Sequence, residues 1–298
     1  MNKIVILTDS ASMLTTALKE EFGVVEIIPM HFYLKGVEYD ADGDWKLFSA
    51  KEYYDLMRNG EIAKSAQITE NQYYTAFKKY LEQGFDVLSI SCTSALSASI
   101  KESYKAKEKL EHEFENQRIE CVDSANCCFS LAMLIKEVSK LRDQGSSMDD
   151  ILKWIDKNKL FFNEVGTVEK LTYLRLAGRI SASAAFFGGI LSVKPIVVYD
   201  EVGHNVAVEK VKGRRASFEK IADYIKKYAK LDVINDVYIA HADCLEDAEM
   251  VADLIQSRFE HKVNFHFGFI EPGVGSSVGP GTLILAFYGL SDVRFLNK

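Results

Sequence analysis

The sequence predicts an α/β protein with two domains. An N-terminal α/β domain with a largely parallel sheet is expected at 1–160, and a C-terminal α+β domain with a mixed sheet at 161–298. Three observations support this. The length of 298 residues exceeds that of a usual single domain. Short β-branched runs alternate with amphipathic stretches in the first half. The second half shows hairpin and αβ patterns instead.

The first domain is expected to contain three buried strands, each ending in small polar residues. These strands are 3–9 (KIVILTD), 85–92 (FDVLSISC) and 118–124 (RIECVDS). Amphipathic segments with helical spacing lie between and after them, at 49–60, 70–84, 97–115 and 130–145. This alternation predicts parallel strands joined by right-handed crossovers. Ligands are then expected beyond the carboxyl ends of the strands.

The second domain begins near residue 160, where the pattern of predicted strands and helices changes. Residues 193–211 read as a hairpin that turns between Asp200 and Asn205, and a helix follows at 217–230. An αβ pair comes next, with a strand at 237–243 and a helix at 245–260. The segment 263–288 is strand-like on either side of a glycine-rich loop. Together these segments predict helices packed on a mixed sheet.

Composition and charge exclude several classes of protein. The net charge is −7 and the basic residues are scattered among acidic ones, so nucleic acid is not an expected partner. One basic cluster, KVKGRR at 210–215, fits a phosphate site or a solvated turn. The apolar run after the first residues spans only five positions, which predicts no signal peptide, no membrane span and a cytoplasmic protein. Five cysteines without a C-x-x-C pair fit a reducing compartment and predict neither a metal nor a cofactor.

A cluster of hydroxyl side chains follows the predicted strand 85–92. Ser94 stands where a helix N-cap belongs, and Ser97 and Ser99 fall in the first turns. Free backbone N–H groups and the helix dipole make such a position a good seat for an anion, and a carboxylate would fit there. The alternative is a serine cap with small residues packed against a neighbouring strand.

Two further polar segments are candidates for a binding site. Thr69 and Gln72 form a capping box, which gives the threonine a structural role and leaves Ser65 unexplained. The segment 272–284 (PGVGSSVGPGTLI) allows close approach of backbone to a ligand, or makes a tight crossover between strands. It lacks the Lys-Ser/Thr ending of a P-loop.

Other features leave a structural and a functional reading open. Phe186 and Phe187, interleaved with small residues in 171–196, fit the wall of an apolar tunnel or tight helix packing. His241 ends a strand, where a histidine with a satisfied ring is commoner than a general base. Cys92 could be a nucleophile, but the sequence shows no residue that would orient a base toward it. No catalytic residue is therefore predicted.

Seven short motifs are spread over nearly the whole chain: Asp9-Ser10, Ser65-Ala66-Gln67-Ile68, Thr93 to Ser99, Asp123-Ser124, Gly178-Arg179-Ile180, Lys194-Pro195-Ile196 and Gly279-Pro280-Gly281-Thr282. In residues and order they resemble the motifs of the DegV family of bacterial fatty-acid-binding proteins. The chain departs from the family pattern at four positions. Ser65 replaces a threonine and keeps its hydroxyl, Ala66 and Ile68 replace a serine and a proline, and Ser277 stands where the family usually has a histidine.

The resemblance implies a non-catalytic protein that holds one long-chain fatty acid of C14–C18 length between its domains. The tail would be buried, and the carboxylate would contact hydroxyls near the domain junction. The implied fatty-acid-binding positions are Ser65, Ser94, Ser97, Ser277, Gly279 and Thr282. Arg179 matches an arginine associated with a partner, a fatty acid kinase that makes acyl phosphate for lipid metabolism. The other reading of Arg179 is an arginine that holds a local carboxylate.

A function of a different class remains open beside fatty acid binding. The chain could be an enzyme or kinase-like subunit that acts on a small hydroxylated or phosphorylated substrate, because the family's second domain resembles part of the dihydroxyacetone kinases. The missing nucleotide-binding motifs count against this alternative.

Overall fold

A four-stranded parallel sheet forms the centre of the first half of the chain. The computed structural model describes residues 3–180 and 193–296. The strands lie in the order β2-β1-β6-β7 and every pair is parallel. Their bounds are β1 Ile4–Asp9, β2 Glu26–Ile28, β6 Asp86–Ser91 and β7 Ile119–Asp123. The three strands predicted for this half are confirmed, and β2 is an additional edge strand.

A six-stranded mixed sheet forms the second half. Its order is β10-β9-β8-β13-β11-β12, in which β11 and β12 are parallel and the other pairs antiparallel. Its strands are β8 Phe162–Thr167, β9 Val193–Tyr199, β10 Asn205–Lys212, β11 Asp236–His241, β12 Asn264–Phe269 and β13 Leu283–Tyr288. The predicted hairpin is β9 and β10, so this part of the prediction is confirmed.

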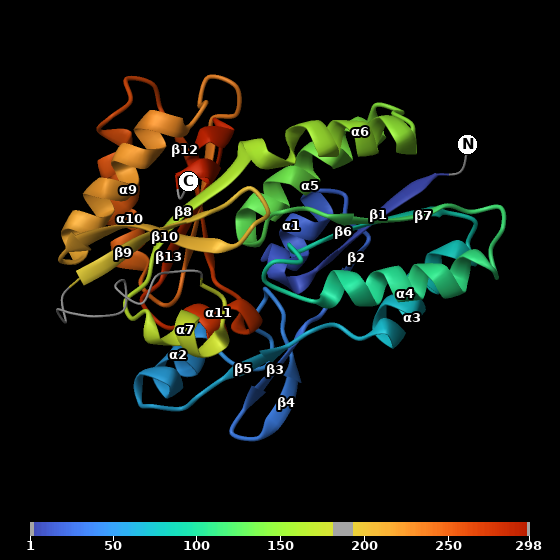
Figure 1. The fold of residues 1–298 in the computed structure, drawn as a ribbon, viewed down its shortest axis with the longest axis horizontal. Helices are drawn as coiled ribbons and strands as arrows, with labels where there is room; N and C mark the ends of the chain where they lie inside the picture. Colours follow the sequence, from blue (N-terminus) through green and yellow to red (C-terminus); the bar gives the residue numbers. More distant parts are fainter. Residues whose placement is uncertain (1–2, 181–192, 297–298) are drawn as a thin grey trace.

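A small three-stranded sheet was not predicted. Strands β3 His31–Leu34, β4 Val37–Asp40 and β5 Lys64–Ala66 pair antiparallel in the order β4-β3-β5. Phe32 of β3 lies opposite Ser65 of β5, so the sheet fixes the position of a candidate hydroxyl. Figure 1 shows this sheet beside the junction of the two larger ones, near α2 and α11.

Helices connect and cover the sheets. Their bounds are α1 Thr16–Glu21, α2 Ala50–Arg58, α3 Glu70–Leu81, α4 Ser99–Glu111, α5 Cys128–Asp143, α6 Met148–Asn158, α7 Thr172–Ala177, α9 Arg214–Tyr228, α10 Leu245–Gln256 and α11 Pro272–Val278. Three short 3-10 turns are η1 Ser10–Ser12, η2 Lys159–Phe161 and η3 Ser291–Phe295. The predicted capping box of Thr69 and Gln72 is confirmed at the start of α3.

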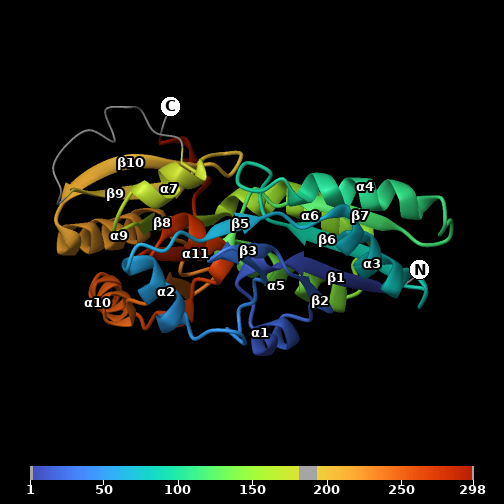
Figure 2. The same ribbon diagram turned by 90° about the horizontal axis from the view of Figure 1, so that it is seen from below.

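The helix layers show how the two halves are joined. Helices α3 and α4 pack against each other and contact the four-stranded sheet, and α9 and α10 cover the six-stranded sheet. Helix α5 follows β7 in sequence, yet it contacts β8, β11 and β13 of the other sheet. Figure 2 shows the resulting elongated molecule, with one sheet toward each end. The first half therefore contributes a helix to the core of the second.

The glycine-rich segment differs from its prediction. Residues 272–278 form the short helix α11 and not a loop. The buried carboxylate of Glu271 caps this helix, because its oxygens accept hydrogen bonds from the backbone N–H groups of Gly273 at 2.7 Å and Val274 at 2.6 Å. Pro272 occupies the first helical position, where a missing N–H has no cost.

A buried arginine joins segments from both halves of the chain. The Arg294 guanidinium donates hydrogen bonds to the carbonyls of Ala125 at 2.9 Å, Asp200 at 3.2 Å and Phe162. It also donates to the side-chain oxygens of Asn126 and Asn163. Burial lowers the pKa of Arg294 to about 10, so it remains charged at neutral pH.

Two sequence expectations concern the chain as a whole. The strands of the parallel sheet all precede residue 124, and those of the mixed sheet all follow residue 161. The boundary between domains at 160 and 161 stays a prediction. Among residues 3–180 and 193–296, no helix is long and apolar enough to cross a membrane.

Candidate functional site

The carboxyl ends of the parallel strands meet at one edge of the four-stranded sheet. Asp9 ends β1, Cys92 follows β6, and Asp123 ends β7. The backbone N–H of Thr93 donates to the carbonyl of Asn126 at 2.8 Å, so the segments after β6 and β7 run side by side. Parallel sheets commonly bind ligands at such an edge.

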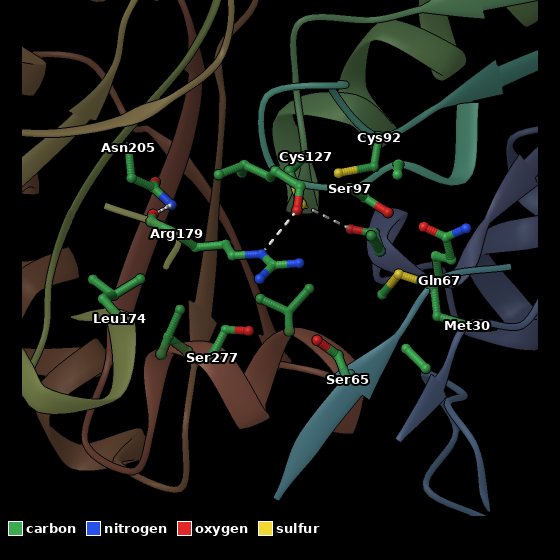
Figure 3. A pocket seen from close by; sticks show the side chains of 17 residues that line it. Met30, Ser65, Gln67, Cys92, Ser97, Cys127, Leu174, Arg179, Asn205 and Ser277 are labelled. Atoms are coloured by element: carbon green, nitrogen blue, oxygen red, sulfur yellow. Dashed lines mark hydrogen bonds between the residues drawn. The ribbon is translucent and has the colours of Figure 1, made fainter. Parts of the chain in front are cut away.

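A cavity of about 290 Å³ lies between this edge and the second half of the chain. Its wall combines residues of both halves: Ala11, Met30, Ser65, Ala66, Gln67, Cys92, Leu96, Ser97, Ala98, Cys127, Leu174, Arg179, Asn205, Gly273, Val274, Ser277 and Val278. Apolar side chains predominate, with a few polar groups among them, as in small-molecule sites. Figure 3 shows these side chains converging from separate elements.

Three serines and one arginine give the cavity a polar side. Ser65 comes from β5, Ser97 from the turn before α4, and Ser277 from α11. In Figure 3 the hydroxyls of Ser65 and Ser277 point into the space beneath the Arg179 guanidinium. A second cavity of about 230 Å³ shares Ser65, Ser277 and Arg179 with the first, so these residues lie where two spaces meet.

Arg179 is held across the boundary between the two halves. Its Nε donates to the carbonyl of Leu96 at 3.1 Å, and Nη1 donates to the carbonyl of Ala177. The side-chain amide of Asn205 donates to the carbonyl of Arg179 at 2.9 Å. The guanidinium is thus placed at the cavity by backbone acceptors, and it carries a positive charge that a carboxylate would meet.

A pair of serines connects the loop after β5 to helix α4. The Ser97 and Ser99 hydroxyls are 2.9 Å apart, and the Ser99 oxygen accepts from the backbone N–H of Ile68 at 3.1 Å. Ser99 is fully buried, so its hydroxyl has a structural role. Ser97 lines the cavity at the other end of this contact.

The prediction that Ser94 caps a helix is wrong. Helix α4 begins at Ser99, with Ala98 at the N-cap position, and residues 94–97 form a turn. The backbone N–H of Ser94 donates to the Asp123 carboxylate, at 3.2 and 3.3 Å to its two oxygens. Ser94 is exposed and does not line the cavity, so the structure gives its predicted head-group contact no support.

Gly279 and Thr282 also lie away from the cavity wall. The Thr282 hydroxyl donates to the carbonyl of Val278 at 2.9 Å and is buried. Gly279 ends α11 with a φ of 78°, and a Cβ there would collide with the ring of Tyr173. Their positions indicate that they shape the end of α11, and their predicted contact with a ligand stays a prediction.

Phe186 and Phe187, considered for an apolar tunnel, lie outside the described residues. His241 is described: its ring packs on Phe269, with centroids 4.5 Å apart, and its Nδ1 accepts from the Cys244 N–H at 3.4 Å. Burial lowers the pKa of His241. These contacts fit the satisfied-ring alternative. Among the residues that the structure describes, no group of three or more acidic, histidine or cysteine side chains could hold a metal ion.

Sequence reasoning missed the contribution of Cys127. It directly precedes α5 and lines the cavity together with Cys92. Both residues follow strand ends in the parallel sheet, which is the one signal in the sequence that could have grouped them. Arg179 was predicted to contact a partner, and the structure adds that it lines the cavity.

A buried carboxyl group supports the cavity wall from behind. Asp9 is fully buried, and its Oδ2 accepts from the backbone N–H of Cys92 at 2.7 Å. Burial raises the pKa of Asp9 to about 7, because the carboxylate loses its surrounding water and no cation among the described residues offsets this loss. Asp9 therefore holds a proton over most of the acidic range.

Comparison with known proteins places this chain in a family. The model of the DegV family, described as "Uncharacterised protein, DegV family", matches residues 3–289. A DegV domain-containing protein from Clostridium perfringens is 31% identical over 291 residues, covering 97% of this chain and 98% of the relative.

Solved structures share the fold over nearly all of both chains. A fatty-acid-binding DegV family protein from Thermus thermophilus has a TM-score of 0.83 at 20% identity, covering 97% of this chain and 100% of the other. A stearic acid-binding protein from Eubacterium ventriosum has a TM-score of 0.82 at 23% identity, with coverages of 98% and 100%. These likenesses confirm the predicted two-domain α/β fold.

We predict that Asp9 makes the stability of the protein decrease between pH 4 and pH 7. The unfolded chain ionises Asp9 near its ordinary pKa of 3.8, whereas the folded protein keeps the proton up to about pH 7. The contribution of Asp9 to the free energy of unfolding is fully present below pH 4 and is lost as the pH rises through 7. A shift of this size corresponds to up to about 4 kcal/mol.

Urea unfolding at a series of pH values checks this prediction. The Asp9→Asn variant should lack this part of the decrease, while Asp156→Asn, at a side chain that is 88% exposed, should follow the wild type. Parallel curves for the wild type and Asp9→Asn would show that Asp9 titrates normally.

Proposed function

The chain belongs to the DegV family, and from this premise we propose that it binds one long-chain fatty acid of C14–C18 length. The acyl chain would be buried and the carboxylate would lie at the polar side of the cavity. One observation carries the proposal: a largely apolar cavity between the two halves has three serines and an arginine on one side. Relatives with this fold are described as binding fatty acids, among them stearic acid.

The head-group contacts proposed are the hydroxyls of Ser65, Ser97 and Ser277 and the guanidinium of Arg179. All four line the same cavity, and Ser277 stands where the family usually has a histidine. A serine at this position keeps a hydrogen-bond donor and loses an ionisable ring. The positive charge needed opposite a carboxylate would then come from Arg179.

The tail and the head group of the fatty acid would contribute differently to the binding free energy. Roughly 14 methylenes at ~0.8 kcal/mol each give about 11 kcal/mol of transfer free energy. Association itself costs ~4–15 kcal/mol, so burial of the tail must provide most of the affinity. Each hydrogen bond to the carboxylate adds ~1.5–3 kcal/mol before desolvation is subtracted, which serves mainly to fix its orientation.

We further propose that the protein is a carrier and not an enzyme, and that it presents its fatty acid to a fatty acid kinase. The kinase would transfer a phosphoryl group to the carboxylate and form an acyl phosphate for lipid metabolism. The proposed head group lies where two cavities meet, beside the exposed residue Arg179, which suits access by a second protein.

The first prediction of this proposal is that the protein binds a fatty acid when it is produced in a bacterial host. Native mass spectrometry should show a bound mass in the range of C14–C18 acids, and extraction with organic solvent should release that acid. The delipidated protein should take up palmitate or oleate with a stoichiometry of one. A delipidated, folded protein that takes up neither acid would refute the proposal.

The second prediction separates hydroxyls at the cavity from a nearby hydroxyl outside it. Ser65→Ala should weaken fatty acid binding by roughly 2- to 10-fold, the value of one lost hydrogen bond. Ser97→Ala should act similarly, and Ser94→Ala is the matched control with little expected effect. Calorimetric titration of the delipidated variants measures the affinities. A larger effect at Ser94 than at Ser65 would contradict the proposed head-group position.

The third prediction tests the partner role of Arg179. With a fatty acid kinase and ATP, the loaded wild-type protein should yield acyl phosphate. Arg179→Ala should weaken fatty acid binding, because the charged head-group contact is lost, and it should also lower the acyl phosphate rate of the fully loaded protein by about tenfold or more, as for loss of a charged interface contact. Measuring kcat/KM for the loaded protein beside the Kd for the acid separates the effects. A weaker Kd with an unchanged kcat/KM for the loaded protein would mean that Arg179 serves the ligand and not the partner.

A further inference from the structure

Three cysteines lie together beside the cavity. Cys92 follows β6, and Cys127 and Cys128 stand at the start of α5. The hydrogen bond from the Thr93 N–H to the Asn126 carbonyl, at 2.8 Å, brings Cys92 and Cys127 next to each other. The Sγ atoms of Cys127 and Cys128 are 3.7 Å apart. Residues far apart in sequence thus form one thiol cluster.

Two of these thiols line the ligand cavity. Cys92 and Cys127 are only 2% and 4% exposed, yet both belong to the cavity wall, as Figure 3 shows. Cys128 is buried and does not line the cavity. Molecules that enter the cavity can therefore reach two thiols that are otherwise shielded from solvent.

The surroundings of Cys127 favour its thiolate form. Cys127 is the N-cap residue of a 16-residue helix, where the helix dipole stabilises negative charge. Hydrogen bonds from the thiols of Cys128 and Cys92 lower the pKa of Cys127. Burial raises the pKa of Cys121 and of Cys244 to about 12. Within the cluster Cys127 is thus the thiol with the lowered pKa, whereas the pKa values of the distant Cys121 and Cys244 are raised.

The backbone at this point is also strained. Cys128 has a φ of 49°, in the left-handed region that non-glycine residues rarely adopt. On the other side of the cluster, Asp9 fixes the backbone of Cys92 through the 2.7 Å hydrogen bond to its N–H. Asp9 Oδ1 is buried and has no hydrogen-bond partner among the described residues. Strain and an unpaired buried polar atom are typical of functional sites.

We propose that Cys127 and Cys92 form a modification site for a hydroperoxide inside the cavity. The Cys127 thiolate attacks the outer peroxide oxygen, so that an S–O bond forms and the O–O bond breaks. The departing oxygen takes a proton and leaves as water or an alcohol. The Cys92 sulfur then attacks the sulfenic acid of Cys127; an S–S bond forms, and hydroxide leaves with the Cys92 proton as water. The dithiol loses two electrons and the peroxide gains them.

The hydroperoxide group has two sources, hydrogen peroxide or a hydroperoxy fatty acid that occupies the cavity. The second source rests on the proposed function, because it requires the cavity to accept an acyl chain. The proposal also implies competition, since a bound fatty acid shields both thiols. At a free fatty acid concentration of about 100 Kd, oxidation should slow about 100-fold if only the empty cavity reacts.

The experiment treats reduced, delipidated full-length protein with hydrogen peroxide or with a hydroperoxide of linoleic acid. Peptide mapping by mass spectrometry should find a Cys92–Cys127 disulfide, with Cys121 and Cys244 still reduced. In Cys92→Ser, dimedone should trap a sulfenic acid at Cys127. Cys121→Ser and Cys244→Ser are the matched controls and should form the disulfide like the wild type. Oxidation of Cys121 or Cys244 before Cys127, or a Cys127–Cys128 disulfide, would overturn the assignment.

Preloading with oleate distinguishes the sources and the two proposals. Protection by oleate, with the lipid hydroperoxide acting at lower concentrations than hydrogen peroxide, would identify a lipid substrate. Protection with equal potency of both oxidants would identify free peroxide. If native mass spectrometry shows bound oleate and oxidation is not slowed, the cavity is not the route to the thiols and this inference fails. If oleate does not bind, the proposed function fails. The treatment with hydrogen peroxide then still shows whether Cys92 and Cys127 form a disulfide.

Discussion

The spacing of the two halves of the molecule depends on a buried charge. Arg294 reaches carbonyls and amide oxygens from the segment after β7, from β8 and from the turn after β9. A buried guanidinium is stable only when its donors are satisfied, so these acceptors must stay in place together. The cavity lies beside this junction, since Cys127 directly follows Asn126. A change in the spacing at Arg294 would therefore change the width of the cavity.

Local sequence patterns predicted the elements whose structure is determined locally. The β-branched runs that became β1, β6 and β7 were recognisable because buried parallel strands are apolar on both faces. The three-stranded sheet was missed because β5 has only three residues and its pairing partner lies more than thirty positions away. The segment 272–278 was misassigned because its helix depends on the Glu271 carboxylate, which overrides low helix propensity of glycine.

The candidate site was predictable in part. Ser65, Ser97, Ser277 and Arg179 were named from motifs, and all four line one cavity. Ser94 was chosen on the assumption that a helix begins there, but the Asp123 carboxylate binds its N–H and turns the chain first. Cys127 could not be found from its neighbours in sequence, because its position at the cavity depends on the pairing of β6 with β7. Contacts between distant segments thus set the limit of sequence reasoning.

The attachment of the small sheet has a mechanical consequence. The Tyr53 and Tyr54 hydroxyls of α2 donate to the carbonyls of Pro272 and Ile270, and α11 packs against β3 and β5. Ser65 is therefore anchored to the second half of the chain, although it precedes two strands of the first. Ile68, three residues later, is bonded to Ser99 of α4. The hydroxyls proposed to hold one head group are thus supported by different parts of the molecule: Ser65 and Ser277 through the contacts of α11 with β5, and Ser97 through Ser99 of α4.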